Sequence, residues 1–354
     1  MMEILEQARL LRAKRAFTTR RVTTGDMRAL ETGPIAPRSG DLVLARVEEV
    51  GRLRRLELTT GRKSALYEGD EIVVAYGNRY APDAYEAEVP ADLSACDLAA
   101  GGGVASQVLN SNALWETRGG PTRIRPIGLL TSASGQILNL QQYALPVRMP
   151  LNRHVPVIAV CGATMNSGKT TTVAGIVRGL TKMGRRVGAA KITGTGSGND
   201  YWKFVDAGAA YVHDFTDAGM ATTYLADIDD VILGAESVVA EQVALGCEAI
   251  VLEIADGVHQ RETRALLSHP RMHALADRWV YAADSAASAA IGWRVMSDCG
   301  LPVSAISGLL TASPLAMREA ADLVRARFCT LPELCEGAAP LGWIDGLRRQ
   351  TAYA

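Results

Sequence analysis

The chain has 354 residues, more than the ~250–300 at which a single hydrophobic core usually stops growing, so two domains are expected. Its 37 basic and 38 acidic side chains nearly cancel, which argues against a nucleic acid or an anionic membrane as the main partner. The six cysteines form no C-x-x-C pair and show no zinc-type spacing with histidine, so we expect reduced, mostly buried thiols.

Residues 1–39 open with the basic stretch MMEILEQARLLRAKRAFTTRR. This stretch lacks the apolar core and cleavage site of a secretory signal, and it predicts a solvated amphipathic helical segment; a transit peptide or a membrane helix are the alternatives. The chain contains no run of about 18 apolar residues that could span a bilayer. The sequence therefore predicts a cytoplasmic protein.

Residues 40–150 predict a small β-rich domain of unknown role. DLVLARVEEVG and RLRRLELTTG alternate apolar and polar residues, YEGDEIVVAYG follows, and RIRPIGLLTSASGQILNL is typical of two strands joined by a Ser/Gly turn. Within this region the glycine cluster AAGGGVASQV predicts a tight connection between strands, with a ligand-binding loop as the alternative.

Residues 151–354 predict a different architecture, in which apolar strands alternate with longer helical segments. The expected strands are VPVIAVCG, RRVGAAKITG, CEAIVLEIADG, RWVYAAD and LPVSAISGLL. Buried strands separated by helices indicate a doubly wound, mainly parallel sheet. The predicted fold class is thus α/β, a P-loop nucleotide-binding domain preceded by a smaller β-rich domain.

The segment GATMNSGKT lies between the first of these strands and a helix expected to begin near Lys169. Backbone amides of residues 166–170 and the helix N-terminus can bind phosphate oxygens. Lys169 would neutralise the β- and γ-phosphates, and Thr170 would bind Mg²⁺. A simple glycine-rich turn is the alternative, but it leaves a cation at the helix start unexplained. The candidate nucleotide-binding residues are Gly162, Asn166, Ser167, Gly168, Lys169, Thr170 and Thr171.

Five residues separate Gly162 from Gly168, one more than in the usual phosphate-binding loop. This spacing resembles the loop of dethiobiotin synthetase and its relatives, including cobyric-acid-type amide ligases and the GTP-binding subunit of molybdopterin-guanine dinucleotide synthesis. A P-loop family linked to N-acyl-D-amino-acid metabolism is also similar here. The resemblance covers roughly residues 155–310. It implies phosphoryl transfer to a carboxylate or carbamate and a homodimer, because the resembled ligases often pair subunits around the site.

The resemblance also implies roles at the end of the second strand, in AAKITGTG. Dethiobiotin synthetase has a lysine at the matching place that faces the reacting groups, so Lys191 is a catalytic candidate, with Thr193 and Thr195 lining the same loop for substrate. A cation is needed there because the reaction brings anions together. The alternative is a strand-end lysine that reaches solvent.

Acidic residues near two strand ends are candidates for holding Mg²⁺ together with Thr170. Glu253 ends the apolar strand AIVLE, and the resembled ligases have a glutamate at the corresponding strand end; Asp200 follows the glycine-rich loop. Glu253 ranks above Asp200, and Asp200 above Asp256, which precedes Gly257 and is expected in a turn. Each carboxylate could instead cap a helix or a turn.

Two further residues are candidates for binding substrate. Asp217 lies in the polar loop HDFTDAGMATTY, and Arg261 could clamp a phosphate or a carboxylate. The alternatives are a solvated loop for Asp217 and the first turn of a helix for Arg261.

The motifs that are missing narrow the choice of nucleotide. No N-K-x-D sequence is present, which favours ATP over GTP, and Thr164 occupies the place of the signature lysine of partition and arsenite-pump ATPases. The sequence predicts a Mg²⁺-ATP-dependent ligase or kinase that phosphorylates a carboxylate of a small metabolite. The alternatives are a nucleotide-binding accessory protein that regulates a cofactor-biosynthesis partner, and an acyltransferase that retains the loop for another phosphate-bearing cosubstrate such as acetyl-CoA.

Overall fold

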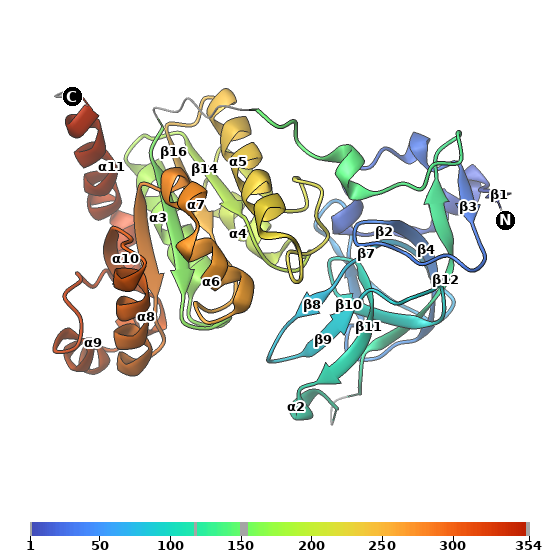
Figure 1. Cartoon of the computed structure of the whole chain (residues 1–354), viewed down its shortest axis with the longest axis horizontal. Helices are drawn as coiled ribbons and strands as arrows, with labels where there is room; N and C mark the ends of the chain where they lie inside the picture. The colour runs from blue at the N-terminus through green and yellow to red at the C-terminus, as the bar shows by residue number, and fades with distance from the viewer. Residues whose placement is uncertain (1, 117–118, 149–154, 352–354) are drawn as a thin grey trace. The chain divides into compact units, whose positions relative to one another are not determined.

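A computed structural model describes residues 2–116, 119–148 and 155–351 and divides the chain into two compact units (Figure 1). The first unit is made of Met1–Leu145, Gly194–Gly198 and Phe215–Ala226. The second is made of Pro146–Thr193, Asn199–Asp214 and Asp227–Ala354. The chain therefore leaves the second unit twice, after β14 and after β15, to complete the first.

The first unit is built around a closed ring of strands. β12 pairs with β4, β4 with β7, β7 with β11, β11 with β10, and β10 again with β12. Within this ring only β7 and β11 run parallel. β3 and β1 extend the sheet beyond β12, and β9 and β8 extend it beyond β11. The elements are β1 (Met2–Ile4), α1 (Gln7–Arg12), β2 (Lys14–Arg15), β3 (Ala29–Glu31), β4 (Leu42–Glu49), β5 (Arg55–Glu57), β6 (Lys63–Ala65), β7 (Glu71–Tyr76), β8 (Arg79–Tyr80), β9 (Tyr85–Glu88), β10 (Cys96–Ala100), β11 (Val104–Ser111), α2 (Ala113–Glu116) and β12 (Thr122–Thr131).

The apolar alternation of these strands gives the ring two packed faces. Val43 and Val47 of β4 join one buried cluster, and Leu42 and Leu44 join a second, because successive side chains of a strand point to opposite faces. The glycine cluster is the tight connection between β10 and β11. Gly103 has φ +97°, and a Cβ there would lie 2.0 Å from the Cβ of a neighbouring alanine, so no side chain fits.

The N-terminal residues differ from the expected helical segment. Only the six residues of α1 are α-helical, whereas β1 and β3 pair in the sheet and β2 pairs with β7. Leu5 and Leu10 are buried against the unit, and the amide of Ala16 donates to the carbonyl of Val73. Packing on the sheet thus outweighs the amphipathic helical pattern, and a run of β-branched threonines after residue 17 weakens that pattern further.

The second unit confirms the expected α/β fold. Its strands run parallel in the order β15-β14-β16-β13-β17-β18. The strands are β13 (Val157–Gly162), β14 (Val187–Lys191), β15 (Tyr211–Asp214), β16 (Ala249–Glu253), β17 (Arg278–Ala282) and β18 (Val303–Ser307). The helices are α3 (Lys169–Lys182), α4 (Asn199–Asp206), α5 (Ile228–Ala244), α6 (Arg261–Ser268), α7 (Pro270–Leu275), α8 (Ala286–Asp298), α9 (Pro314–Ala321), α10 (Leu331–Glu336) and α11 (Ala338–Thr351).

Helices cover both faces of this sheet (Figure 1). Val160 of β13 packs in the cluster that α3 completes, whereas the sulfur of the next residue, Cys161, lies 3.5 Å from the sulfur of Met296 in α8. Adjacent residues of a strand point to opposite faces, so α3 and α8 lie on opposite sides. None of the helices in the described part of the chain is both long and apolar enough to cross a bilayer.

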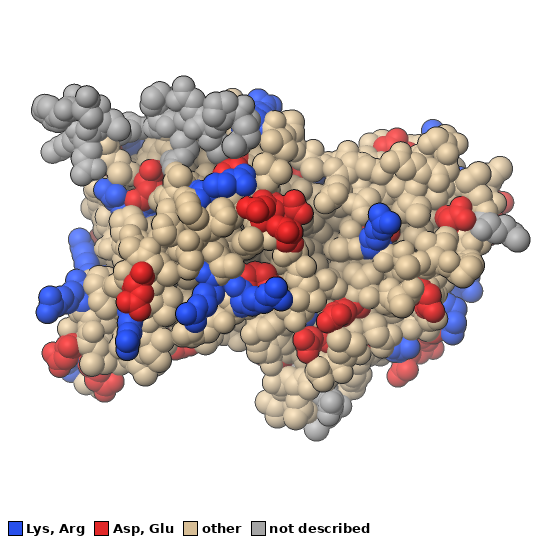
Figure 2. Space-filling view, viewed as in Figure 1, with Lys and Arg blue, Asp and Glu red and all other residues tan. Residues whose placement is uncertain are grey.

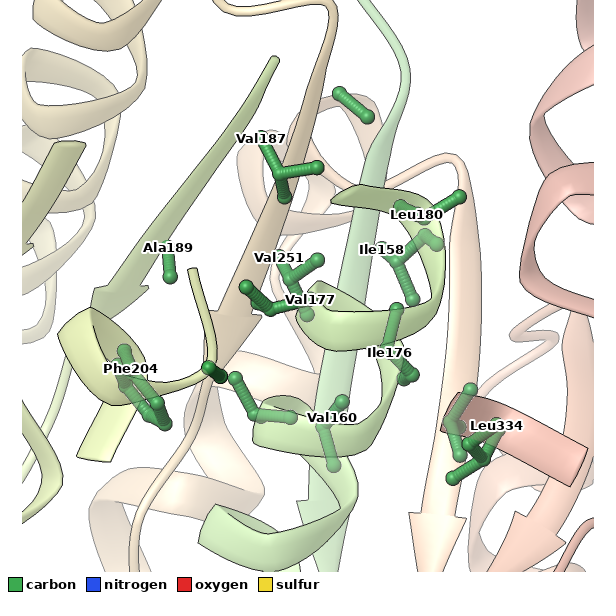
Figure 3. Packing of buried hydrophobic residues seen from close by; sticks show 14 of the residues in the cluster. Ile158, Val160, Ile176, Val177, Leu180, Val187, Ala189, Phe204, Val251 and Leu334 are labelled. Carbon is green, nitrogen blue, oxygen red and sulfur yellow. The ribbon is translucent and has the colours of Figure 1, made fainter. Parts of the chain in front are cut away.

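The core beneath α3 fixes the loop that precedes this helix. Figure 3 shows Ile158 and Val160 of β13 packed against Ile176 and Val177 of α3, with Leu334 of α10 beside them. All five side chains are fully buried. Because the strand and the helix on either side of the glycine-rich loop share this core, the two ends of the loop cannot move independently.

Surface charge is mixed on the face shown in Figure 2, where basic and acidic side chains are interspersed. This agrees with the formal net charge of −1. The absence of a nucleic-acid or membrane partner stays a prediction.

Candidate phosphate-binding site

The glycine-rich loop joins the end of β13 to the start of α3, and the helix begins at Lys169 as expected. Gly168 caps the helix with φ +97°, a conformation that favours glycine. A Cβ on Gly162 would lie 2.4 Å from the hydroxyl of Ser167, so this glycine allows the loop to fold tightly on itself. The amides of the first helical turn have no acceptor within the helix and are suited to an anion.

Lys169 is buried, with only 3% of its surface exposed. Its ammonium group donates to the carbonyl oxygens of Thr164 (2.6 Å) and Met165 (3.4 Å) of the loop. Burial lowers the pKa of Lys169, and the carboxylates of Glu253 and Asp256 oppose this effect. A buried cation whose ammonium group donates to neutral carbonyl oxygens is suited to receive an anionic ligand.

Thr170 connects the loop to two carboxylates. Its hydroxyl oxygen lies 3.0 Å from Asp200 Oδ1 and 3.1 Å from Glu253 Oε1. Asp200 belongs to the first turn of α4, and Glu253 is the last residue of β16. The structure therefore brings together the three residues that the sequence nominated for Mg²⁺, from three separate segments.

Lys191 joins this cluster from the adjacent strand. In the register of β14 and β16, Lys191 stands opposite Glu253, and its ammonium group forms a short ion pair with Asp200. Burial alone would lower the pKa of Lys191, but the carboxylates of Asp200 and Glu253 outweigh it and raise the pKa above its usual value. Burial would raise the pKa of Asp200, but Lys191 and the hydrogen bond from Thr170 hold it below its usual value.

Glu253 is the least compensated charge of the cluster. It is 2% exposed, and its buried Oε2 atom has no hydrogen-bond partner among the residues that the structure describes. Burial and the nearby charge of Asp200 raise the pKa of Glu253 to about 7, despite the opposing effect of Lys191 and Lys169. An unsatisfied carboxylate oxygen beside a threonine hydroxyl fits the oxygen ligands that Mg²⁺ takes in phosphate sites.

The described residues contain no cluster of three or more His, Cys, Asp or Glu side chains placed to hold a metal ion. The candidate Mg²⁺ site is of a different kind, with two carboxylates and one hydroxyl, and such a site relies on the phosphates of a nucleotide for further ligands.

The other residues nominated in the loop have structural contacts. Ser167 is fully buried and donates from its hydroxyl to the carbonyl of Thr164 at 3.0 Å. The hydroxyl of Thr171 accepts from Lys203 at 2.7 Å, and Asn166 is exposed. Ser167 therefore shapes the loop, whereas Asn166 and Thr171 lie on its accessible side.

Of the residues nominated for substrate, Thr193 and Arg261 belong to the second unit. Thr193 is buried, and its hydroxyl accepts from the amide of Ala255 at 2.7 Å, so it holds the segment that follows β16. Arg261 is exposed at the first position of α6, with Gln260 as the helix cap.

Thr195 and Asp217 belong to the first unit. Thr195 forms a bridge with Thr222. Asp217 is 4% exposed and pairs with Arg20 at 2.5 Å and with Arg21 at 3.8 Å. This carboxylate therefore has a structural role in holding the segment Phe215–Ala226 to the N-terminal part of the chain.

The sequence did not nominate a cavity of about 240 Å³ beside the loop. Its lining includes Gly168, Thr172, Ser307, Thr311, Leu331 and Pro332. These residues come from the start of α3, the end of β18, the 3₁₀ turn Leu309–Ala312 and the start of α10. The only sequence signal was the position of Ser307 at the carboxyl end of a strand, the edge at which parallel sheets bind ligands.

The parallel sheet, the glycine-rich loop after β13 and the buried lysine at the start of α3 define the class, a P-loop nucleotide-binding fold. No protein-family model matches the chain, and no curated protein matches its sequence.

Three solved structures show a distant likeness to part of the chain. The signal recognition particle 54 kDa protein of Aeropyrum pernix K1 in complex with GDP is 19% identical, over 58% of this chain and 51% of that one, with a TM-score of 0.36. The signal recognition particle receptor FtsY of Elizabethkingia anophelis is 13% identical, over 59% and 65%, with a TM-score of 0.34. The cell division protein ftsY of Thermotoga maritima is 14% identical, over 59% and 64%, with a TM-score of 0.34. The chain thus spans between about half and two thirds of these three proteins, and the assignment of the site rests on its own geometry.

Proposed function

We propose that this protein is a Mg²⁺-ATP-dependent ligase or kinase that phosphorylates a carboxylate or similar oxyanion of a small metabolite. The observation that carries the proposal is the hydroxyl of Thr170 between the carboxylates of Asp200 and Glu253, one residue after the buried Lys169. In such an arrangement the loop and Lys169 bind the phosphates, and Thr170 with the two carboxylates holds Mg²⁺. The ion supplies charge neutralisation at the transferred phosphoryl group when it is bound.

Lys191 is the residue proposed to orient the acceptor. It stands in register with Glu253 and is held by Asp200, so its ammonium group is kept at the carboxyl edge of the sheet. A lysine there would screen the repulsion between an anionic acceptor and the phosphates. This role supports placing the protein in the dethiobiotin-synthetase-like branch of the class.

The cavity next to Gly168 is proposed to hold the nucleoside. It adjoins the start of α3, and Leu331 and Pro332 supply apolar surface while Ser307 and Thr311 supply polar groups. A mainly apolar cavity with a few polar groups is typical of small-ligand sites. The missing N-K-x-D sequence favours adenine over guanine as the base.

The nucleotide site is tested with Lys169→Ala and with Lys182→Ala as the matched control. Lys182 is exposed in the last turn of the same helix. Titration calorimetry with ATP and with GTP, each with and without Mg²⁺, should give Mg²⁺-dependent binding of ATP to the wild type and to Lys182→Ala, and a loss of roughly tenfold or more in Lys169→Ala. Unchanged binding in Lys169→Ala would overturn the nucleotide site, and tighter binding of GTP would overturn the choice of ATP.

The acceptor is tested by ADP release in the presence of a panel of amino acids and dicarboxylic acids. A ligase or kinase should be nearly silent with ATP alone and active once its acceptor is added, and Lys191→Met should abolish that stimulation. Slow hydrolysis that no acceptor stimulates would instead support the accessory protein. Binding of acetyl-CoA without Mg²⁺-dependent binding of ATP would support the acyltransferase. The homodimer stays a prediction.

A further inference from the structure

The first unit contains a separate cavity of about 280 Å³ between its N-terminal segment and the turn that joins β5 to β6. Leu10 and Leu58 supply apolar surface, and Thr24 and Thr59 supply hydroxyl groups. The charged residues in its lining are Lys14 and Arg15, both basic. The charged side chains of the cavity are therefore positive. None of its lining residues belongs to the phosphate site.

Lys14 is compensated within the protein. Its ammonium group donates to the carbonyl of Ala65 at 2.8 Å and forms a short ion pair with Asp70. It therefore contributes little net charge to the cavity.

The charge of Arg15, in contrast, is not neutralised by an ion pair with a carboxylate of the described residues. Its guanidinium group donates only to neutral acceptors: the hydroxyl of Thr24, the carbonyl of Thr19 at 3.1 Å and the carbonyl of Val22 at 2.6 Å. Within residues 2–116, 119–148 and 155–351, no carboxylate forms an ion pair with this group, and its buried Nε atom has no acceptor. Burial alone lowers the pKa of Arg15. Arg15 is partly buried, and a partly buried charge is stabilised by a counter-ion, which none of its three neutral acceptors supplies.

We propose that this cavity binds a small carboxylate with a short apolar chain, and that Arg15 is its counter-ion. The carboxylate would neutralise the guanidinium group and accept from the hydroxyls of Thr24 and Thr59. The chain would pack on Leu10 and Leu58. The apolar surface beside one uncompensated cation favours such an acid over inorganic phosphate, which needs polar partners on every side.

The test uses the full chain, with sodium butyrate as the probe and butyramide as its uncharged counterpart, at constant ionic strength. Calorimetry and the thermal midpoint should show binding of butyrate to the wild type and none of butyramide. Arg15→Gln should weaken butyrate binding by roughly tenfold or more, because a charge-assisted hydrogen bond is lost. Arg46→Gln is the matched control, since Arg46 is an exposed arginine of the same unit, and it should bind butyrate normally.

Thr24→Asp keeps the experiment informative if Arg15→Gln fails to fold. The new carboxylate would lie beside the guanidinium group as an internal counter-ion, so this variant should be folded, more heat-stable than the wild type, and unable to bind butyrate. Phosphate is tested in Lys169→Ala, where the loop no longer binds it. Equal binding of butyramide, unchanged butyrate binding in Arg15→Gln or Thr24→Asp, or binding of phosphate in place of butyrate would each overturn the proposal.

Discussion

Glu253 provides a direct test of the carboxylate cluster, because its charge should destabilise the protein in the absence of Mg²⁺. Its pKa is raised to about 7 from the usual 4.5, by burial first and by Asp200 second. Between these two pH values the folded protein keeps the proton that the unfolded chain releases. The free energy of unfolding should therefore fall as the pH rises from 4.5 through about 7. The difference between the two pKa values corresponds to a loss of at most roughly 3 kcal/mol in the free energy of unfolding, reached once the pH is above this range.

Glu253→Gln should remove this cost while keeping an oxygen that accepts from Thr170. In EDTA at pH 8.5, the variant should be more stable than the wild type by up to roughly 3 kcal/mol, and at pH 5 the two should agree within about 1 kcal/mol. Urea denaturation at both pH values measures this. Added Mg²⁺ and ATP should then stabilise the wild type more than the variant, because the variant lacks a metal ligand.

Glu236→Gln is the control for a buried glutamate with a compensated charge. Glu236 is 6% exposed, and its two oxygens accept from Arg271 at 3.0 and 2.6 Å. This substitution should lower the stability at both pH values. If Glu253→Gln were as stable as the wild type, or less stable, at pH 8.5 in EDTA, the description of Glu253 as an uncompensated charge would be refuted.

Three further substitutions test the site and its support. Gly308→Ala should destabilise the protein more than Gly184→Ala, by roughly 1–3 kcal/mol in urea denaturation. Both glycines have a positive φ, but only a Cβ at position 308 would meet a backbone oxygen, at 2.4 Å. Thr170→Val should weaken ATP binding in Mg²⁺ but not in EDTA, whereas Thr181→Val, near the other end of the same helix, should change it little; equal losses in calorimetry would contradict the assignment of the metal ligand. Gly179→Ala places a Cβ 2.0 Å from a carbonyl of α10, so it should lower the thermal midpoint and weaken nucleotide binding together.

The parts of the site that the sequence predicts lie at strand ends. Lys191 and Glu253 were nominated from the resemblance to dethiobiotin synthetase and its relatives, supported by the rule that parallel strands bind ligands at their carboxyl ends. The register of β14 and β16 sets these two residues opposite each other. Lys169 and Thr170 followed from the glycine spacing and the helix start. The local sequence pattern is sufficient to predict Lys169 and Thr170 because the strand, the loop and the helix that position them follow one another in the chain.

Contacts between distant segments could not be predicted. The closed ring depends on the pairing of β10 with β12 and of β7 with β11, and a single sequence carries no signal of such pairing. Asp217 was nominated for substrate because it is polar and lies in a loop, but Arg20, far from it in the chain, neutralises it. Likewise, the polar Thr193 is used to hold the amide of Ala255. Composition and period do not distinguish a polar side chain that binds a ligand from one that satisfies the backbone.

A short segment of the first unit separates the two charged partners of the cluster along the chain. Lys191 ends β14 and Asp200 lies in the first turn of α4, and the segment Gly194–Gly198 between them belongs to the first unit. The amide of Gly198 donates at 2.8 Å to Glu57, a carboxylate that is 3% exposed. This segment is therefore anchored immediately before the helix that carries Asp200. Within the second unit, the ion pair of Lys191 and Asp200 joins the two ends of the chain between which this segment lies.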